Sequence, residues 1–323
     1  MSLRGAAAGL WGRVPAVSPE RYRKVTLVAL CLLVFIVVTG AAVRLTGSGL
    51  GCTDWPTCEN NRVVAPFERH AMIEFVNRMI TGLVSVAVVL AVLGSIKRAP
   101  RRRDLTLLSF GLVAGVVAQI VLGGVVVLFD LNPVLVQGHF VVSMILVANA
   151  VVLHHRAGRP AGATRPLVTA RVQALGRGIL ALAGLVILTG TAVTGSGPHA
   201  GDIEARRLPF TVHATARVHG TVVFVFLAAV VLLAWLAHRE SAPAKVMQSV
   251  RVLLFVLVLQ AAIGYTQYFT GIPPLLVALH VLGASLVWIF ALFLLLGLSS
   301  PVGVPPDLRD DDDGAGRDLV AQR

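Results

Sequence analysis

The chain has 323 residues, of which 56% are hydrophobic and only 14% carry a charge. Soluble globular domains carry about 25% charged residues, so this composition excludes an ordinary soluble protein and indicates an integral membrane protein. The formal net charge of +12 would suggest nucleic-acid binding in a soluble chain. Here we expect no nucleic-acid partner and attribute the charge to a surface that faces the anionic lipids of a bilayer.

Eight apolar stretches are each long enough, at about 20 residues, to cross the hydrocarbon core as an α-helix. They lie at 25–43, 72–96, 105–129, 134–154, 176–194, 212–237, 249–269 and 275–298. The first stretch exceeds the apolar core of a secretory signal, so we expect it to be retained. The predicted fold class is an all-α membrane protein with eight transmembrane helices.

Lysine and arginine residues gather in alternate loops. They precede the first span and recur in the segments 97–103, 156–177 and 239–251. The loops between hold only Arg44, Arg62, Arg69, Arg206 and Arg207. The positive-inside rule therefore predicts that both the N and C termini are cytoplasmic, and we expect a multi-pass protein of the cell (cytoplasmic) membrane.

The two halves of the sequence are related by a repeat. The tetrapeptide TGSG occurs at 46–49 and again at 194–197. Rare residue types also match at one offset of 141 residues, and the arginines at an offset of 139. The matched pairs are Gln119 and Gln260, Gly123 and Gly264, Pro133 and Pro274, His139 and His280, and Arg78 and Arg217. The repeat predicts two tandem pseudo-symmetric four-helix bundles with one membrane orientation.

The predicted domain organisation follows from the spans and the repeat. It comprises a cytoplasmic N-terminal segment (1–24), an N-terminal four-helix bundle (25–156), a cytoplasmic linker (157–175), a C-terminal four-helix bundle (176–298) and an acidic cytoplasmic tail (299–323). The tail is polar and has no apolar periodicity, so we expect it to be disordered.

Polar residues within the spans mark the candidate sites, because a polar side chain at membrane depth is costly and should face the bundle interior. His139 and His280 each lie six residues after a proline that can begin a helix, so we expect both about 9 Å below the outer end of their helices. In the span 72–96, Glu74 and Arg78 stand at i,i+4 with Asn77 between them.

The span 212–237 offers two histidines and one arginine. His213 and Arg217 stand at i,i+4, and His219 follows. His213 and His219 point about 120° apart on a helix, so one face cannot present both equally. Imidazoles from facing helices of a bundle can hold haem, whereas a single membrane histidine can also be a hydrogen-bonded packing residue. Arg78 and Arg217 could pair with haem propionates, or Arg78 could neutralise Glu74.

Cys52 and Cys58 lie in the first outer loop, on the oxidising side of the membrane, and we expect a disulfide between them. It would either staple the loop or take part in thiol–disulfide exchange. Cys31 lies in the middle of a span and is interpreted as a small apolar core residue.

Several motifs together resemble the haem A synthase family. They are GSGLGCTDWPTC after the first span, EFVNR in the second, Gln119 with QGHF at His139, TGSGPHAGD after the fifth span, and ALHVLGASLV at His280. The resemblance covers residues 25–298. It implies oxidation of the C8 methyl group of haem O, the substrate, to a formyl group, which makes haem A for terminal oxidases.

The resemblance also implies residue roles and partners. The N-terminal half would take the substrate haem, with Glu74, Asn77, Arg78 and His139 in the catalytic pocket and His139 on the haem iron. The C-terminal half would hold haem b through His280 and a histidine of the span 212–237, for which we favour His219 over His213, with Arg217 nearby. The implied partners are the lipid bilayer, haem O synthase and an unidentified electron donor, and a homo-oligomer is possible.

The sequence departs from the family where a His-Arg pair is expected. It reads Asn77-Arg78 in one half and Ala216-Arg217 in the other. With His139 as the only protein ligand, the N-terminal haem would keep an open coordination position, as oxidation of a C–H bond requires. Glu74 would then be a proton donor or acceptor, or only the salt-bridge partner of Arg78.

Two other functions remain as alternatives. A membrane b-type cytochrome would carry electrons through His-ligated haems in both halves without chemistry on the porphyrin. A transporter would fit the repeat alone, although no span has a proline near its centre.

Overall fold

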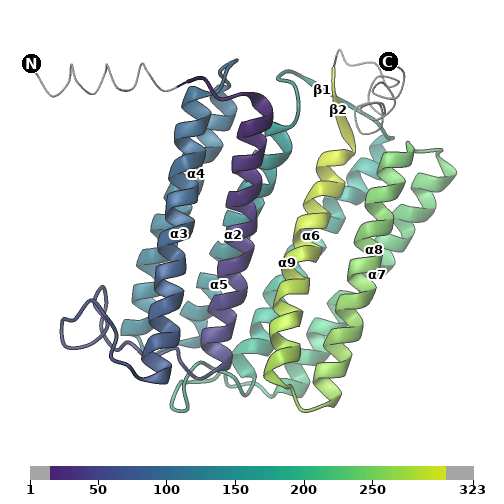
Figure 1. Cartoon of the computed structure of the whole chain (residues 1–323). Helices are drawn as coiled ribbons and strands as arrows, with labels where there is room; N and C mark the ends of the chain where they lie inside the picture. Colours follow the sequence, from purple (N-terminus) through teal and green to yellow (C-terminus); the bar gives the residue numbers. More distant parts are fainter. Residues whose placement is uncertain (1–14, 303–323) are drawn as a thin grey trace, which may run out of the picture.

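The computed structural model describes residues 15–302, and within them eight long helices run side by side (Figure 1). The helices are α2 (Pro19–Leu45), α3 (Arg69–Lys97), α4 (Arg103–Leu128), α5 (Pro133–Ala157), α6 (Ala170–Ser196), α7 (Val212–Arg239), α8 (Ala244–Phe269) and α9 (Pro274–Gly297). All eight are long and apolar enough to cross a membrane. The prediction of an all-helical chain with eight apolar spans is confirmed.

Several helices begin before their apolar stretch, because polar residues cap them. At α2 the Ser18 hydroxyl accepts a hydrogen bond from the backbone N–H of Arg21, and Pro19 occupies the first turn. At α6 the Thr169 hydroxyl accepts from the N–H of Val172. The helix α6 therefore begins at Ala170, inside the segment 157–175 that we expected to be a linker.

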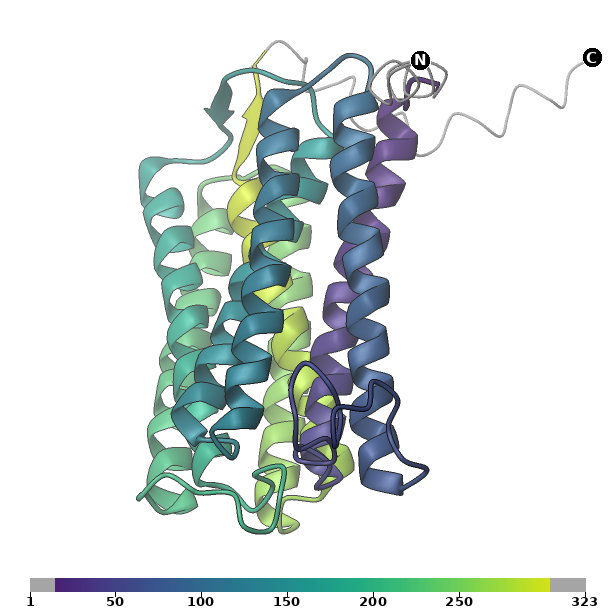
Figure 2. The ribbon, with the colours of Figure 1, turned by 90° about the vertical axis from the view of Figure 1, so that its left-hand side faces the viewer.

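The contacts between helices indicate two groups of four. In the first group α2 contacts α3 and α5, and α4 contacts the same two helices. The second group repeats this closed ring, with α6 and α8 each contacting α7 and α9. Between the groups, α9 contacts α2 and α5, and α5 contacts α6. Figure 2 shows the same side-by-side packing of the helices in a view turned by 90°.

Each group has its own apolar core. The first core is built around buried residues such as Leu105, Leu112 and Val147, and the second around Phe226 and Leu253. Trp288 of α9 packs against both cores, and its indole N–H donates to the carbonyl oxygen of Met144 in α5 at 2.9 Å. Large apolar side chains elsewhere point outward, as expected of helices that face lipid.

Two short strands close the end of the structure opposite the disulfide loop (Figure 1). β1 (Thr164–Pro166) pairs antiparallel with β2 (Ser299–Pro301). The segment expected to be a disordered tail thus begins with three residues in a strand, because the backbone after α9 meets the linker. The rest of that tail from 303, and the N-terminal segment up to 14, lie outside the described residues.

Candidate functional site

Two histidines face each other inside the second helix group. His219 of α7 and His280 of α9 have ring centroids 6.4 Å apart, with the ring planes inclined by 73°. The helices α7 and α9 are not neighbours in the ring of four, so the imidazoles meet across its interior. Glycines leave room for them: a Cβ at Gly190 would lie 3.2 Å from Cε1 of His219, and one at Gly264 would lie 2.9 Å from Cε1 of His280.

Hydrogen bonds orient this pair. The Thr189 hydroxyl lies 3.1 Å from Nδ1 of His219 and within hydrogen-bond distance of the carbonyls of Leu185 and Val186. Because one hydroxyl has one hydrogen, which a carbonyl receives, the hydroxyl accepts from Nδ1–H of His219. That tautomer leaves Nε2 with a free lone pair. The Gln260 amide donates to the carbonyl oxygen of His280 at 2.7 Å.

The geometry of the pair fits haem. Two imidazole nitrogens that share one metal ion each bond it at about 2 Å, which places the ring centroids roughly 6 Å apart. Within residues 15–302 there is no group of three or more His, Cys, Asp or Glu side chains that could hold a bare metal ion. A pair of imidazoles therefore suits a metal that brings four ligands of its own, as haem iron does.

His139 in the first group shares two of the contacts that His280 makes. The Gln119 amide donates to its carbonyl oxygen at 3.0 Å, and a Cβ at Gly123 would lie 3.4 Å from its Cε1. The Nδ1 atoms of His139 and His280 are both buried without a hydrogen-bond partner. The repeat read from the sequence is therefore also a repeat of local geometry.

The two groups differ in what α3 and α7 contribute. The position that corresponds to His219 is Ile80, by the offset that relates Arg217 to Arg78. The histidine of α3, His70, lies at the helix start and bonds to Ser48 and Arg69. In α3, Asn77 instead has a buried side-chain amide oxygen without a hydrogen-bond partner.

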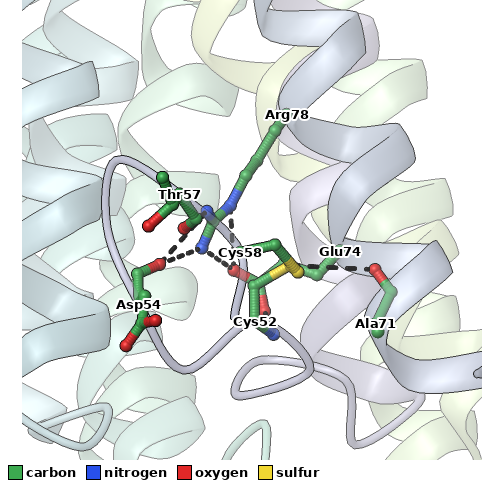
Figure 3. Close-up of a disulfide and its surroundings, with 7 residues drawn as sticks. All are labelled: Cys52, Asp54, Thr57, Cys58, Ala71, Glu74 and Arg78. Carbon is green, nitrogen blue, oxygen red and sulfur yellow. Dashed lines mark hydrogen bonds and ion pairs between the residues drawn. A yellow bond between two sulfur atoms is a disulfide. The ribbon is translucent and has the colours of Figure 1, made fainter. Parts of the chain in front are cut away.

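Glu74 and Arg78 form an ion pair that holds the disulfide loop (Figure 3). The Glu74 side chain is buried; Oε2 accepts from the backbone N–H of Cys52 at 2.8 Å, and Oε1 accepts from Arg78 at 2.6 and 3.1 Å. The Arg78 guanidinium also donates to the carbonyl oxygens of Thr57 and Asp54 at 2.8 and 3.3 Å. Of the two roles open for Arg78, the structure has it neutralising Glu74.

The expected disulfide between Cys52 and Cys58 is present, and both cysteines are buried inside the loop that carries them. With Ala65 and Ala71 they form a small apolar cluster at the start of α3. The other cysteine of the described chain, Cys31, is exposed on α2. Our interpretation of Cys31 as a core residue is therefore wrong, because its helix turns that position away from the interior.

The ion pair leads to a test of loop docking. Replacing Arg78 with alanine leaves the buried Glu74 carboxylate without its counter-charge, which costs up to about 3–5 kcal/mol. We expect a lower melting temperature and faster proteolytic cleavage in the loop 46–68. Arg62→Ala is the matched control, because Arg62 lies exposed in the same loop and contributes only backbone hydrogen bonds. Equal melting temperatures for the two variants would contradict the role of the Glu74–Arg78 ion pair in holding the loop.

Comparison with known proteins matches this chain to one family model. The COX15-CtaA model, described as a cytochrome oxidase assembly protein, matches residues 23–70 and 63–292. The chain belongs to the COX15-CtaA family. A relative from Macrococcus caseolyticus, described as "Heme A synthase", is 24% identical over 82% of this chain and 93% of its own length.

Shorter matches reach other COX15-CtaA relatives that carry the same description. The protein from Lysinibacillus sphaericus is 30% identical over 42% of this chain and 44% of its own length. The protein from Bacillus pumilus is 32% identical over 41% of this chain and 43% of its own length. In these two cases the match spans less than half of the relative.

For a COX15-CtaA member, His213 of α7 is of interest because it lies apart from the facing pair. The Nδ1 atom of His213 lies 2.8 Å from the Tyr268 hydroxyl, and its Nε2 lies 2.6 Å from Arg217. Arg217 has no carboxylate within ion-pair distance among the described residues. The structure thus brings His219, and not His213, beside His280.

Sequence reasoning missed three contributors to the site. Thr189 orients His219, Ser143 shares the Gln119 amide with the carbonyl of His139, and Trp55 packs on Gly124 of α4. The dipeptide TG occurs at 39–40 and again at 189–190, and in the second copy its hydroxyl and glycine contact an imidazole. Nothing in the sequence pattern pointed to Ser143 or to the partner of Trp55.

Proposed function

We propose that this COX15-CtaA protein is a haem A synthase that oxidises the C8 methyl group of haem O to a formyl group. The first helix group takes haem O as substrate, and the second holds a resident haem b. One observation carries the proposal: His280 faces a second imidazole, whereas His139, its counterpart in the repeat, faces none among the described residues. Two axial ligands suit electron transfer, whereas one leaves a coordination position open for chemistry.

In the second group, His219 and His280 are the residues that would hold the iron of haem b. Thr189 and Gln260 keep these two imidazoles in place. Arg217 lies two residues before His219 on α7 and has no carboxylate partner in the described chain. It is available to pair with a propionate, and His213 and Tyr268 orient its guanidinium.

In the first group, His139 would hold the iron of haem O, and the haem supplies the redox chemistry when bound. The chain's own residues bind and orient the substrate. Gln119 fixes the backbone at His139, and Asn77 offers a buried, unbonded amide oxygen to a polar group of the substrate. Both oxygens of Glu74 already accept hydrogen bonds, which supports a positioning role for this carboxylate in preference to proton transfer.

The membrane arrangement that fits this function places both termini in the cytoplasm. The loops at the end with the disulfide would be extracytoplasmic, because most lysines and arginines of the loops lie at the other end. The ring of contacts that recurs in each group supports a pseudo-twofold relation between two tandem bundles. Haem O synthase is a fitting partner, since an apolar substrate would otherwise partition into lipid, and an electron donor is required.

The experiment that tests the proposal is production of the chain in a host with and without a haem O supply, followed by analysis of extracted haems. We expect haem A, with a hydroxylated precursor, only when haem O is supplied. Recovery of unchanged haem O together with low-spin haem in both groups would instead favour an electron-carrying b-type cytochrome. Recovery of neither haem A nor its hydroxylated precursor contradicts the proposal.

A further inference from the structure

Trp55 packs against the same turn of α4 that contacts His139. A Cβ at Gly124 would lie 2.5 Å from the Trp55 indole, whereas one at Gly123 would lie 3.4 Å from Cε1 of His139. Successive residues of a helix point about 100° apart. The indole and the imidazole therefore occupy adjoining faces of α4.

The face that Trp55 covers is the outer, apolar surface of the helix. Val117 and Leu128 stand seven residues before and four residues after Gly124, which places them on its face, and both are exposed. The Trp55 side chain is itself 36% exposed. Trp55 thus lies where the face of α4 that contacts His139 meets the surface that faces lipid.

Hydrogen bonds to the backbone of the disulfide loop hold Trp55 in place. The Arg78 guanidinium binds the carbonyl oxygens of Asp54 and Thr57, which lie on either side of Trp55 in the sequence (Figure 3). Glu74 in turn binds both Arg78 and the backbone of Cys52. The ion pair and the disulfide together fix the backbone from which the indole projects.

The second helix group has a different arrangement at this place. The residue that corresponds to Gly124 is Tyr265, whose ring stacks on Phe269 with centroids 6.3 Å apart. The loop before α7, at 197–211, contains neither tryptophan nor cysteine. A loop-borne aromatic seated on a glycine is therefore a feature of the proposed substrate group, while the haem b group carries a helix-borne aromatic there.

We propose that Trp55 binds the isoprenoid side chain of haem O where that chain leaves the pocket of His139. This inference rests on the proposed function. Haem O and haem b share the macrocycle, but only haem O carries a long isoprenoid chain. A macrocycle held at His139 needs an apolar exit for that chain, and a rigid indole at the rim supplies a large apolar contact there. Glu74 and Arg78 act as positioning residues for Trp55.

Binding of two haems to Trp55→Ala tests the inference. The full-length purified protein, with its resident haem b in place, is titrated with haem O and separately with haem b, and the first group is followed by absorbance. We expect affinity for haem O to fall about tenfold, or about 1.4 kcal/mol, with affinity for haem b changed less than about twofold. Trp55→Phe should restore most of the affinity, because it keeps an apolar ring.

Gly124→Ala provides a second variant that leaves Trp55 in the chain. Its added Cβ displaces the indole, so the same selective loss of haem O is expected. Gly82→Ala is the matched glycine control, since no atom other than its chain neighbours and the adjacent backbone of its own helix lies within 4 Å of its Cβ position. Trp235→Ala controls for loss of an exposed tryptophan. Trp235 lies near the C-terminal end of α7, where it contacts Arg239 and not α4.

The outcomes separate the inference from the proposed function. Equal loss of both haems in Trp55→Ala and Gly124→Ala, or no loss of either, would overturn the role of Trp55 in binding the isoprenoid chain. If Trp55→Ala loses the spectrum of the resident haem and so fails to fold, Gly124→Ala decides. Failure of the unaltered protein to bind haem O at all would contradict the proposed function itself.

Discussion

Haem A formation is expected to fall to background in His139→Ala, while the low-spin spectrum of haem b is retained. His139 lies inside the first helix group, where the Gln119 amide donates to its carbonyl oxygen and its ring lies next to Gly123. Under the proposed assignment, removing it would leave the substrate iron without a protein ligand. The second group has its own core, so the resident haem should be unaffected.

The measurement for His139→Ala is haem analysis after supply of haem O, paired with the absorbance spectrum of the purified protein. His238→Ala is the matched control, because His238 is exposed in the last turn of α7, far from the paired imidazoles. Retention of haem A formation in His139→Ala would rule out the assignment of the substrate pocket. Loss of both haems would show that the two pockets are not independent.

Nearly complete loss of the tightly bound haem is expected in His280→Ala and in His219→Ala. Each substitution removes one of two facing imidazoles whose ring centroids are 6.4 Å apart. The remaining histidine would give the iron only one protein ligand, so any haem that stays bound should change from low spin to high spin. Haem content per protein and a redox titration of the purified variants measure the effect.

His213→Ala discriminates between His213 and His219 as the α7 ligand. His213 bonds to Tyr268 and Arg217 and has no contact with His280, so this variant should keep a low-spin haem. A shifted midpoint potential is the expected change, since the orientation of Arg217 beside a propionate would be altered. If His213→Ala loses the haem and His219→Ala keeps it, the ligand assignment is wrong.

Much of the architecture was already determined by the sequence. Apolar stretches of about 20 residues predict spans because every backbone polar group in lipid must be satisfied within a helix. Rare residues matched at a constant offset predict the repeat, and in the structure Gln119 donates to the carbonyl of His139 as Gln260 donates to that of His280. Two cysteines in one loop, which we expected to lie on the oxidising side of the membrane, were sufficient to predict the disulfide.

The tertiary structure alone decided which side chains meet. Helical phase places His213 and His219 about 120° apart, but it does not say which direction is the bundle interior, because that depends on how α6, α8 and α9 pack around α7. The partner of Arg78 was open for the same reason, and the structure gives it loop carbonyls as well as Glu74. Contacts such as Trp55 with Gly124 join segments about 70 residues apart through packing, which leaves no periodic signal in the sequence.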